Sequence, residues 1–128
     1  MLSYRNLSMA AAMAAISVSI VYAFIPVVAN FFFGIEGDLE SNYVLRRSGF
    51  LLFGVGIIAW MSRNEMPSIA RVAITRGIAI AMFGVMLSAI YEVFFGIAGP
   101  LIWVLIILEA FFGAAFLYYS FEKAEQSG

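Results

Sequence analysis

The 128 residues of this sequence include no cysteine and no histidine. The side chains left that could take part in a reaction are mainly its few charged ones, which make up 12% of the chain. Without cysteine and histidine there is no thiolate nucleophile, no imidazole base, and no Cys or His ligand for a metal or a haem. Two acids, Glu92 and Glu109, fall beside or within apolar sequence, and no nucleophile, metal site or redox group accompanies them. We therefore expect no catalytic residue, no metal site, no cofactor and no enzymatic activity.

Glu109 is the residue best suited to a functional role. It lies near the middle of the last apolar run, 100–121, and a lone charge at that depth of a bilayer costs about 2.5–3.5 kcal/mol or more. Such a carboxyl group should be protonated or should face a partner inside a helix bundle. Counting along the helices places Arg76 and Arg47 within side-chain reach of this depth. We predict that one of these two arginines pairs with Glu109.

A second ion pair is predicted nearer the membrane surface, between Glu92 and Arg46. On a helical wheel, Arg46 lies at the edge of the packing face of its helix, whereas Arg47 points away from that face. Asn30 is expected beside this pair, and Arg47 is expected to reach the lipid headgroups or Glu109. The candidate intramembrane polar site comprises Glu109, Arg76, Arg47, Arg46, Glu92, Asn30 and Tyr22. Two interpretations stay open: a buried pair that fixes helix register, or a site for a proton, an ion or a small anion.

Membrane-spanning helices must position these groups. Apolar residues make up 64% of the chain and charged residues 12%, which is more apolar surface than a soluble domain of this length can bury. A spanning helix needs about 20 mainly apolar residues, and four runs satisfy this requirement. We predict an all-α integral membrane four-helix bundle in a single transmembrane domain, with spans over 7–33, 43–62, 67–95 and 100–121.

The distribution of basic residues predicts the orientation of this bundle, since short cytoplasmic loops carry an excess of Lys and Arg. Four spans place both termini on one side of the membrane, and that side has the larger number of basic residues. They are Arg5, Arg63, Arg71, Arg76 and Lys123, against Arg46 and Arg47 on the other side. Both termini are therefore expected in the cytoplasm. The net charge of −1 does not indicate a nucleic-acid partner, and the expected partner is the lipid bilayer.

A short phrase occurs twice, as FFGIEG over 32–37 and as FFGIAG over 94–99. Each copy lies where an apolar run stops, and Gly34 and Gly96 stand where a left-handed glycine commonly ends a helix. Both copies are therefore expected at helix ends on the same side of the membrane. The chain then divides into two helical hairpins related as a parallel repeat. Whether they arose by duplication, or whether common apolar residues recur by chance, stays open.

Small residues recur at helical spacing in three of the runs, which predicts helix–helix packing faces in lipid. Along the chain these faces are Ser8, Ala12, Ala15, Ser19, Tyr22, Pro26 and Asn30; Gly49, Phe53, Gly56 and Trp60; and Ala70, Ala73, Gly77, Ala81, Gly84, Ser88 and Tyr91. Pro26 cannot donate a hydrogen bond to the Tyr22 carbonyl, which predicts a kink in the first span. That kink is either a tolerated membrane proline or an unwound edge that lines a cavity.

The segment LRRSGFLLFGVGIIAW (45–60) is followed by a basic-flanked apolar span and by a last span with one acidic residue. This pattern resembles short four-span bacterial inner-membrane proteins of a domain-of-unknown-function family, distantly similar to the DoxX-like proteins. The resemblance covers most of the chain and implies a bacterial cytoplasmic membrane. It implies no activity, because the cysteines and other redox residues that indicate electron transfer are missing.

Two classes of function fit these observations. The first is an accessory or scaffold bundle that self-associates or docks on a larger membrane complex, in agreement with the small size and short loops. The second is a binding or permeation module, such as a channel or a proton-coupled carrier for a small solute, an ion or a lipophilic ligand. This second class would use Glu109 paired with an arginine. We expect the first class, as a homo-oligomer or in association with other membrane proteins.

Overall fold

The computed structural model describes residues 2–122, which form five helices and, over this range, no strand. The helices are α1 (Tyr4–Phe24), α2 (Pro26–Phe33), α3 (Leu39–Ser62), α4 (Ile69–Phe94) and α5 (Ile102–Tyr119). Four of them, α1, α3, α4 and α5, are long and apolar enough to cross a membrane. The predicted all-α membrane bundle with four spans is therefore confirmed.

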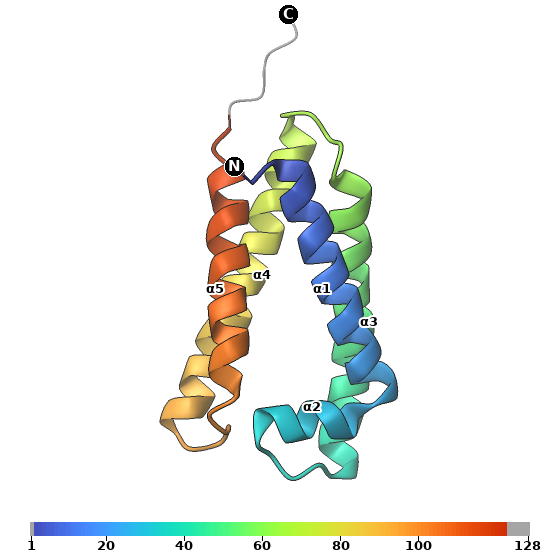
Figure 1. The fold of residues 1–128 in the computed structure, drawn as a ribbon, viewed down its shortest axis with the longest axis vertical. Coiled ribbons are helices and arrows are strands. Elements are labelled where there is room, and N and C mark those ends of the chain that lie inside the picture. The colour runs from blue at the N-terminus through green and yellow to red at the C-terminus, as the bar shows by residue number, and fades with distance from the viewer. Residues whose placement is uncertain (1, 123–128) are drawn as a thin grey trace, which may run out of the picture.

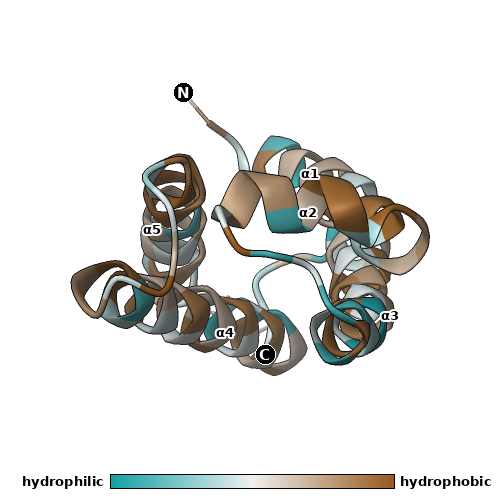
Figure 2. Ribbon diagram, turned by 90° about the horizontal axis from the view of Figure 1, so that it is seen from below, coloured by the Kyte–Doolittle hydropathy of each residue, from teal (hydrophilic) through white to brown (hydrophobic). Residues whose placement is uncertain are grey.

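The long helices form two hairpins that lean together like the legs of an inverted V (Figure 1). α1 pairs with α3, and α4 pairs with α5. The hairpins approach each other where α1 and α4 start and where α3 and α5 end, which we call the converging end. They separate toward α2 and the α4–α5 connection, which we call the diverging end (Figures 1 and 2). Both hairpins thus start at the same end, as the predicted parallel arrangement requires.

Glycines of α3 allow a close approach to α1. A Cβ atom added at Gly49 would lie 2.9 Å from the Ser19 carbonyl oxygen, and one at Gly56 would lie 3.4 Å from the Ala12 carbonyl oxygen. Ser19 and Ala12 are themselves buried. The predicted packing faces of the first two spans are therefore confirmed at these positions. The remaining residues predicted for the α3 face are exposed, namely Phe53 and Trp60.

The second hairpin packs differently from the prediction. The small-residue face predicted for the third span is exposed at every position: Ala70, Ala73, Gly77, Ala81, Gly84, Ser88 and Tyr91. Instead, the Phe83 ring of α4 lies against Gly113 of α5, where an added Cβ atom would be 3.0 Å from the ring. The prediction was wrong because the close contact combines a glycine of α5 with a ring of α4, and does not need small residues on both helices.

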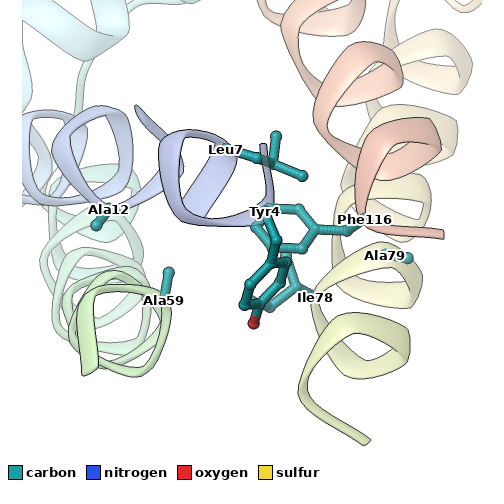
Figure 3. Packing of buried hydrophobic residues seen from close by; sticks show 7 residues of the cluster. All are labelled: Tyr4, Leu7, Ala12, Ala59, Ile78, Ala79 and Phe116. Atoms are coloured by element: carbon teal, nitrogen blue, oxygen red, sulfur yellow. The ribbon is translucent and has the colours of Figure 1, made fainter. Parts of the chain in front are cut away.

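The main apolar core lies at the converging end and joins the two hairpins (Figure 3). Leu7 of α1 and Phe116 of α5 are fully buried there, and Tyr4 and Ile78 pack beside them. Because lipid is already apolar, such a core stabilises a membrane protein mainly through dispersion contacts between well-packed side chains. The converging end is therefore a junction between the hairpins.

The predicted first span, 7–33, consists of two helices. α1 ends at Phe24, Ile25 leaves the helical conformation with φ −132° and ψ 57°, and Pro26 is the first residue of α2. Proline suits this position, since the first residues of a helix have no intrahelical partner for an N–H group. Pro26 therefore separates two helices, where a kink within one helix was predicted. α2 runs across the diverging end (Figure 2).

The two copies of the repeated phrase adopt the same turn. Gly34 has a φ of 68° and Gly96 a φ of 70°, which confirms the predicted left-handed glycines. In both copies the isoleucine that follows the glycine donates its N–H to the carbonyl five residues earlier, as in a Schellman motif. The copies also meet in space, because Gly34 packs on Gly99. The repeated phrase thus links the ends of α2 and α4.

Candidate functional site

A cleft lies between the two hairpins, and all four long helices line it. Its inner part, toward the converging end, has a volume of about 520 Å³. Its outer part, toward the diverging end, has a volume of about 630 Å³. The two parts adjoin, because they share five lining residues: Tyr22, Ser48, Val85, Leu105 and Glu109.

The inner part of the cleft has an almost entirely apolar lining. Short side chains of α1, such as Ala11 and Ala15, leave space that α3, α4 and α5 do not fill. Phe112 lines the opposite wall, and Phe116 marks the point where the cleft meets the converging-end core. Hydroxyl and carboxyl groups in this lining come from Tyr22, Ser48 and Glu109.

The outer part of the cleft is acidic. Asp38, Glu40 and Glu92 line it together with Glu109. Within residues 2–122, neither part of the cleft is lined by a lysine or an arginine. The cleft therefore changes along its length, from negatively charged at the diverging end to apolar at the converging end.

Glu109 stands between these two regions. It follows Ile102, the first residue of α5, by seven positions, which places it about 10 Å along a helix of about 27 Å. Its Oε2 atom is buried and has no hydrogen-bond partner among the described residues. A buried polar atom without a partner costs about 1–3 kcal/mol, and more if it is charged. Glu109 therefore brings unused hydrogen-bonding capacity to the middle of the cleft.

Arg46 does not pair with Glu92, contrary to the prediction. Arg46 and its neighbour Arg47 are exposed and line neither part of the cleft. Two residues turn a helix by about 200°, so Arg46 projects from the side of α3 opposite the cleft-lining Ser48. Arg47 donates a 2.8 Å hydrogen bond from Nη1 to the hydroxyl oxygen of Tyr43, one turn earlier on the same helix. Both guanidinium groups thus stay on the outer surface of the first hairpin.

Glu109 also has no arginine partner in the described part of the chain. Arg76 is exposed and lies two residues before the cleft-lining Ile78, so it projects away from the cleft. The one salt bridge among residues 2–122 joins Arg71 to Glu122. The predicted pairing of Glu109 with Arg76 or Arg47 is therefore wrong, because neither arginine lies on the face of its helix that lines the cleft.

The other predicted residues divide between the cleft and its surroundings. Tyr22 lines both parts of the cleft, and Glu92 lines the outer part. Asn30 is buried outside the cleft lining and donates a 2.8 Å hydrogen bond from Nδ2 to Oδ1 of Asn42. This hydrogen bond between the two amide side chains links α2 to α3. Of the predicted residues, the structure thus brings together Glu109, Glu92 and Tyr22.

A cluster centred on Arg71 at the converging end lies outside the predicted site. Arg71 Nη2 is 2.6 Å from Glu122 Oε2, and Arg71 Cζ is 3.8 Å from the centre of the Tyr4 ring. The Tyr4 hydroxyl donates a 3.2 Å hydrogen bond to Ser62 Oγ. The cluster therefore connects α1, α3, α4 and the segment after α5. Arg71 Cζ also lies 5.5 Å from the centre of the Tyr119 ring. The sequence offers one signal for this cluster: Tyr4, Arg71 and Tyr119 lie at similar depths when the helix ends are aligned.

Comparison with protein-family models, with curated proteins and with solved structures finds no match to this chain. The resemblance to four-span bacterial membrane proteins stays a prediction. The four spanning helices are those of a small multi-pass membrane protein, and the cleft between them is the feature from which a more specific function can be inferred.

Proposed function

We propose that this small multi-pass membrane protein binds an amphipathic molecule in the cleft between its two hairpins. One observation carries the proposal: the unpartnered carboxyl group of Glu109 lies halfway along a cleft whose inner lining is apolar. An alkyl chain or a ring system would occupy the inner part against Phe112. The polar group of the ligand would then meet Glu109, Tyr22 and Ser48.

The size and the lining of the cleft support this role. Ligand sites in proteins commonly enclose about 300–1,000 Å³ and combine apolar walls with a few placed polar groups. The inner part alone measures about 520 Å³. Because the cleft lies between spanning helices, a lipophilic molecule can enter it from the bilayer. Its lining holds carboxylates but no histidine or cysteine, so we propose binding or carriage and no catalysis.

Photolabelling tests the proposal. The purified protein in lipid nanodiscs is irradiated with a neutral dodecanol analogue that carries a diazirine, and the labelled peptides are mapped. We expect saturable labelling of cleft-lining residues that excess dodecanol prevents. Val85→Phe enlarges a side chain that lines both parts of the cleft and should reduce the labelling several-fold. Leu87→Phe, at an exposed position outside the cleft lining, is the matched control and should leave the labelling unchanged.

Two results would overturn this proposal. The first is labelling that rises without saturation and falls evenly on the lipid-facing surface. The second is equal labelling of the Val85→Phe and Leu87→Phe proteins, after thermal unfolding has shown that both are folded.

A second candidate function, an accessory role through self-association, is favoured by the exposed face of α4. At Gly77 and Gly84 an added Cβ atom would meet no neighbouring atom within 4 Å in the described part of the chain. Small residues allow helices to approach closely in lipid, so we propose a second copy of α4 as the occupant of this face. The chain has no cysteine, so with copper phenanthroline and oxygen as the oxidant Gly84→Cys should form a disulfide-linked dimer and Phe111→Cys on α5 should not. Equal crosslinking of the two variants, or a monomer in several mild detergents, would exclude this role.

We also propose that the membrane is the bacterial cytoplasmic membrane and that the converging end faces the cytoplasm. Arg5, Arg63 and Arg71 lie at or near this end, which supports the orientation because cytoplasmic ends are enriched in basic residues. Lys123, which also enters the prediction, lies outside the described residues. A fluorescent protein fused after residue 128 should fold and fluoresce, whereas an alkaline phosphatase fused there should be inactive. The reverse result would invert the orientation.

A further inference from the structure

We infer that the molecule bound in the cleft is an amphipathic cation, namely a hydrophobic amine in its protonated form. This inference rests on the proposed function and names the chemical class of its ligand. It follows from three features of the cleft: the sign of the charges along it, the order of polar and apolar regions, and the unpartnered oxygen of Glu109.

The charges along the cleft have one sign. Asp38, Glu40 and Glu92 line its outer part, and Glu109 lines both parts, while no basic residue of the described chain lines either part. Charges interact strongly where low-dielectric walls exclude water, and a cleft lined by one sign of charge concentrates ligands of the opposite sign. An anionic ligand would approach four acidic side chains without a compensating cation.

The arginines of the chain are placed so that they do not neutralise this field. Arg46 and Arg76 project from helix faces opposite the cleft, as described above. Arg71 lies at the converging end, beyond the apolar core, and its guanidinium is already paired with Glu122 at 2.6 Å. The cleft therefore keeps its negative charge available for a ligand.

The order of polar and apolar regions matches a molecule with one charged end. From Glu109 to Phe116 the α5 side of the cleft extends about 10 Å, since these residues are seven positions apart. Over this length the lining is apolar, with Phe112 between them. A ligand whose ammonium group is at Glu109 can therefore place its hydrophobic part in the inner cleft. The opposite placement would put a charge among apolar side chains and a hydrocarbon chain among carboxylates.

The unpartnered oxygen of Glu109 favours a charged donor over a neutral one. A carboxylate among apolar groups is costly, and either a proton or a nearby cation relieves the cost. An ammonium group supplies the opposite charge and the hydrogen-bond donor that Oε2 lacks within residues 2–122. Tyr22, which lines the cleft at the same level, adds an aromatic face to which a cation is attracted.

The test compares three competitors that share a dodecyl chain and differ in the head group. Dodecylamine is cationic at neutral pH, dodecanol is neutral, and dodecanoate is anionic. Each is titrated against the diazirine photolabel in nanodiscs of zwitterionic lipid, and its partition is measured in nanodiscs without protein. We expect the amine to displace the label at a concentration about tenfold or more below that of dodecanol, since charge-assisted hydrogen bonds are about twice as strong as neutral ones. Dodecanoate should displace the label least.

Two variants separate the role of charge from that of shape. Glu109→Gln keeps the size of the side chain and removes its charge, so dodecylamine and dodecanol should displace the label from this variant at similar concentrations. Glu36→Gln is the matched control, because Glu36 is exposed near the diverging end and lines neither part of the cleft. Ser48→Lys places a cation in the lining and should reverse the preference in favour of dodecanoate, whether or not Glu109→Gln folds.

The outcomes distinguish this inference from the proposed function on which it rests. Saturable labelling with equal displacement by all three head groups would overturn the cationic ligand and leave an amphipathic ligand in place. A preference for the amine that survives in both Glu109→Gln and Ser48→Lys would also overturn the inference. Absence of saturable labelling by the neutral probe would overturn the proposed function itself.

Discussion

The backbone N–H of Gly99 donates a 2.6 Å hydrogen bond to the carbonyl oxygen of Phe33, and this bond joins the two copies of the repeated phrase. Phe33 ends α2, and Gly99 lies in the connection between α4 and α5. The bond therefore links the two hairpins at the diverging end, as the core around Phe116 links them at the converging end. The cleft that contains Glu109 is held between these two junctions.

Alanine at Gly34 should weaken the diverging-end junction more than alanine at Gly96. Both glycines have positive φ, at 68° and 70°, so alanine costs each about 1–2 kcal/mol in backbone strain. At Gly34 the added Cβ would also lie 2.7 Å from Gly99 Cα, whereas at Gly96 it would meet no neighbouring atom within 4 Å among residues 2–122. Thermal unfolding in detergent should give a lower midpoint for Gly34→Ala. Equal midpoints would contradict the packing of Gly34 on Gly99.

Alanine should destabilise the protein at Gly49, where α3 contacts α1, and should not destabilise it at Gly54. An added Cβ at Gly49 would lie 2.9 Å from the Ser19 carbonyl oxygen and 3.0 Å from the Ala23 nitrogen, and overpacking of this kind costs about 1–3 kcal/mol. An added Cβ at Gly54 would meet no atom of a neighbouring helix within 4 Å among residues 2–122, so alanine should be neutral or should stabilise α3 by up to about 1 kcal/mol through its helix propensity. Unfolding followed by circular dichroism measures both variants. If Gly54→Ala were as destabilising as Gly49→Ala, the close helix contact could not be the cause.

The spans and the helix-ending glycines could be predicted because both depend on local sequence. A long apolar run specifies a spanning helix in lipid whatever its neighbours are. Likewise, a left-handed turn after an apolar run favours glycine, and Gly34 and Gly96 occupy those positions in both copies of the phrase. The break at Pro26 was predicted only as a kink, because proline is compatible with a bent helix and with the start of a new one.

The partners of each helix face could not be predicted, because a helical wheel gives directions within one helix only. Arg46 was expected beside Glu92 from their similar depth and from the position of Arg46 at the edge of the packing face of its helix. The structure pairs α3 with α1 and α4 with α5, and the cleft separates the two pairs. The helical wheel likewise predicted that the face of α4 around Gly84 packs on another span. In the structure this face is exposed, and α4 contacts α5 through Phe83 and Gly113.

Replacement of Arg71 by lysine should lower the free energy of unfolding, because it weakens the contacts at the converging end. Lysine keeps the charge but cannot stack a planar group 3.8 Å from the centre of the Tyr4 ring, which should cost about 0.5–2 kcal/mol. Glu122→Gln removes only the ion pair and should cost less, about 0–1 kcal/mol, because 40% of the Glu122 side chain is exposed. Thermal unfolding should rank the two variants in this order, with the exposed Arg5→Lys as an unaffected control. A larger loss for Glu122→Gln would contradict the stacking role of Arg71.

The start of α3 should respond to acid through Asp38. Its Oδ1 accepts a 2.7 Å hydrogen bond from the Ser41 N–H, and Ser41 Oγ accepts a 3.0 Å bond from the Asp38 N–H, which together form a capping box. The Ser41 backbone hydrogen bond, followed by the Ser41 side-chain hydrogen bond, lowers the pKa of Asp38 below its ordinary value of 3.8. A carboxyl group whose pKa is lower in the folded state stabilises that state fully above the unfolded value, and the contribution is lost as the pH falls through the folded value.

The amide signal of Ser41, followed by NMR in detergent during an acid titration, should therefore show a transition below the ordinary pKa of aspartate. Asp38→Asn keeps a side-chain oxygen that can cap the helix but has no titrating group, so its Ser41 signal should not show this transition. Asp38→Ala removes the cap at every pH, and its first turn of α3 should exchange amide hydrogens faster than the wild-type turn at neutral pH. An identical acid transition in Asp38→Asn would assign the response to another carboxyl group and would contradict the role of the Asp38 carboxylate.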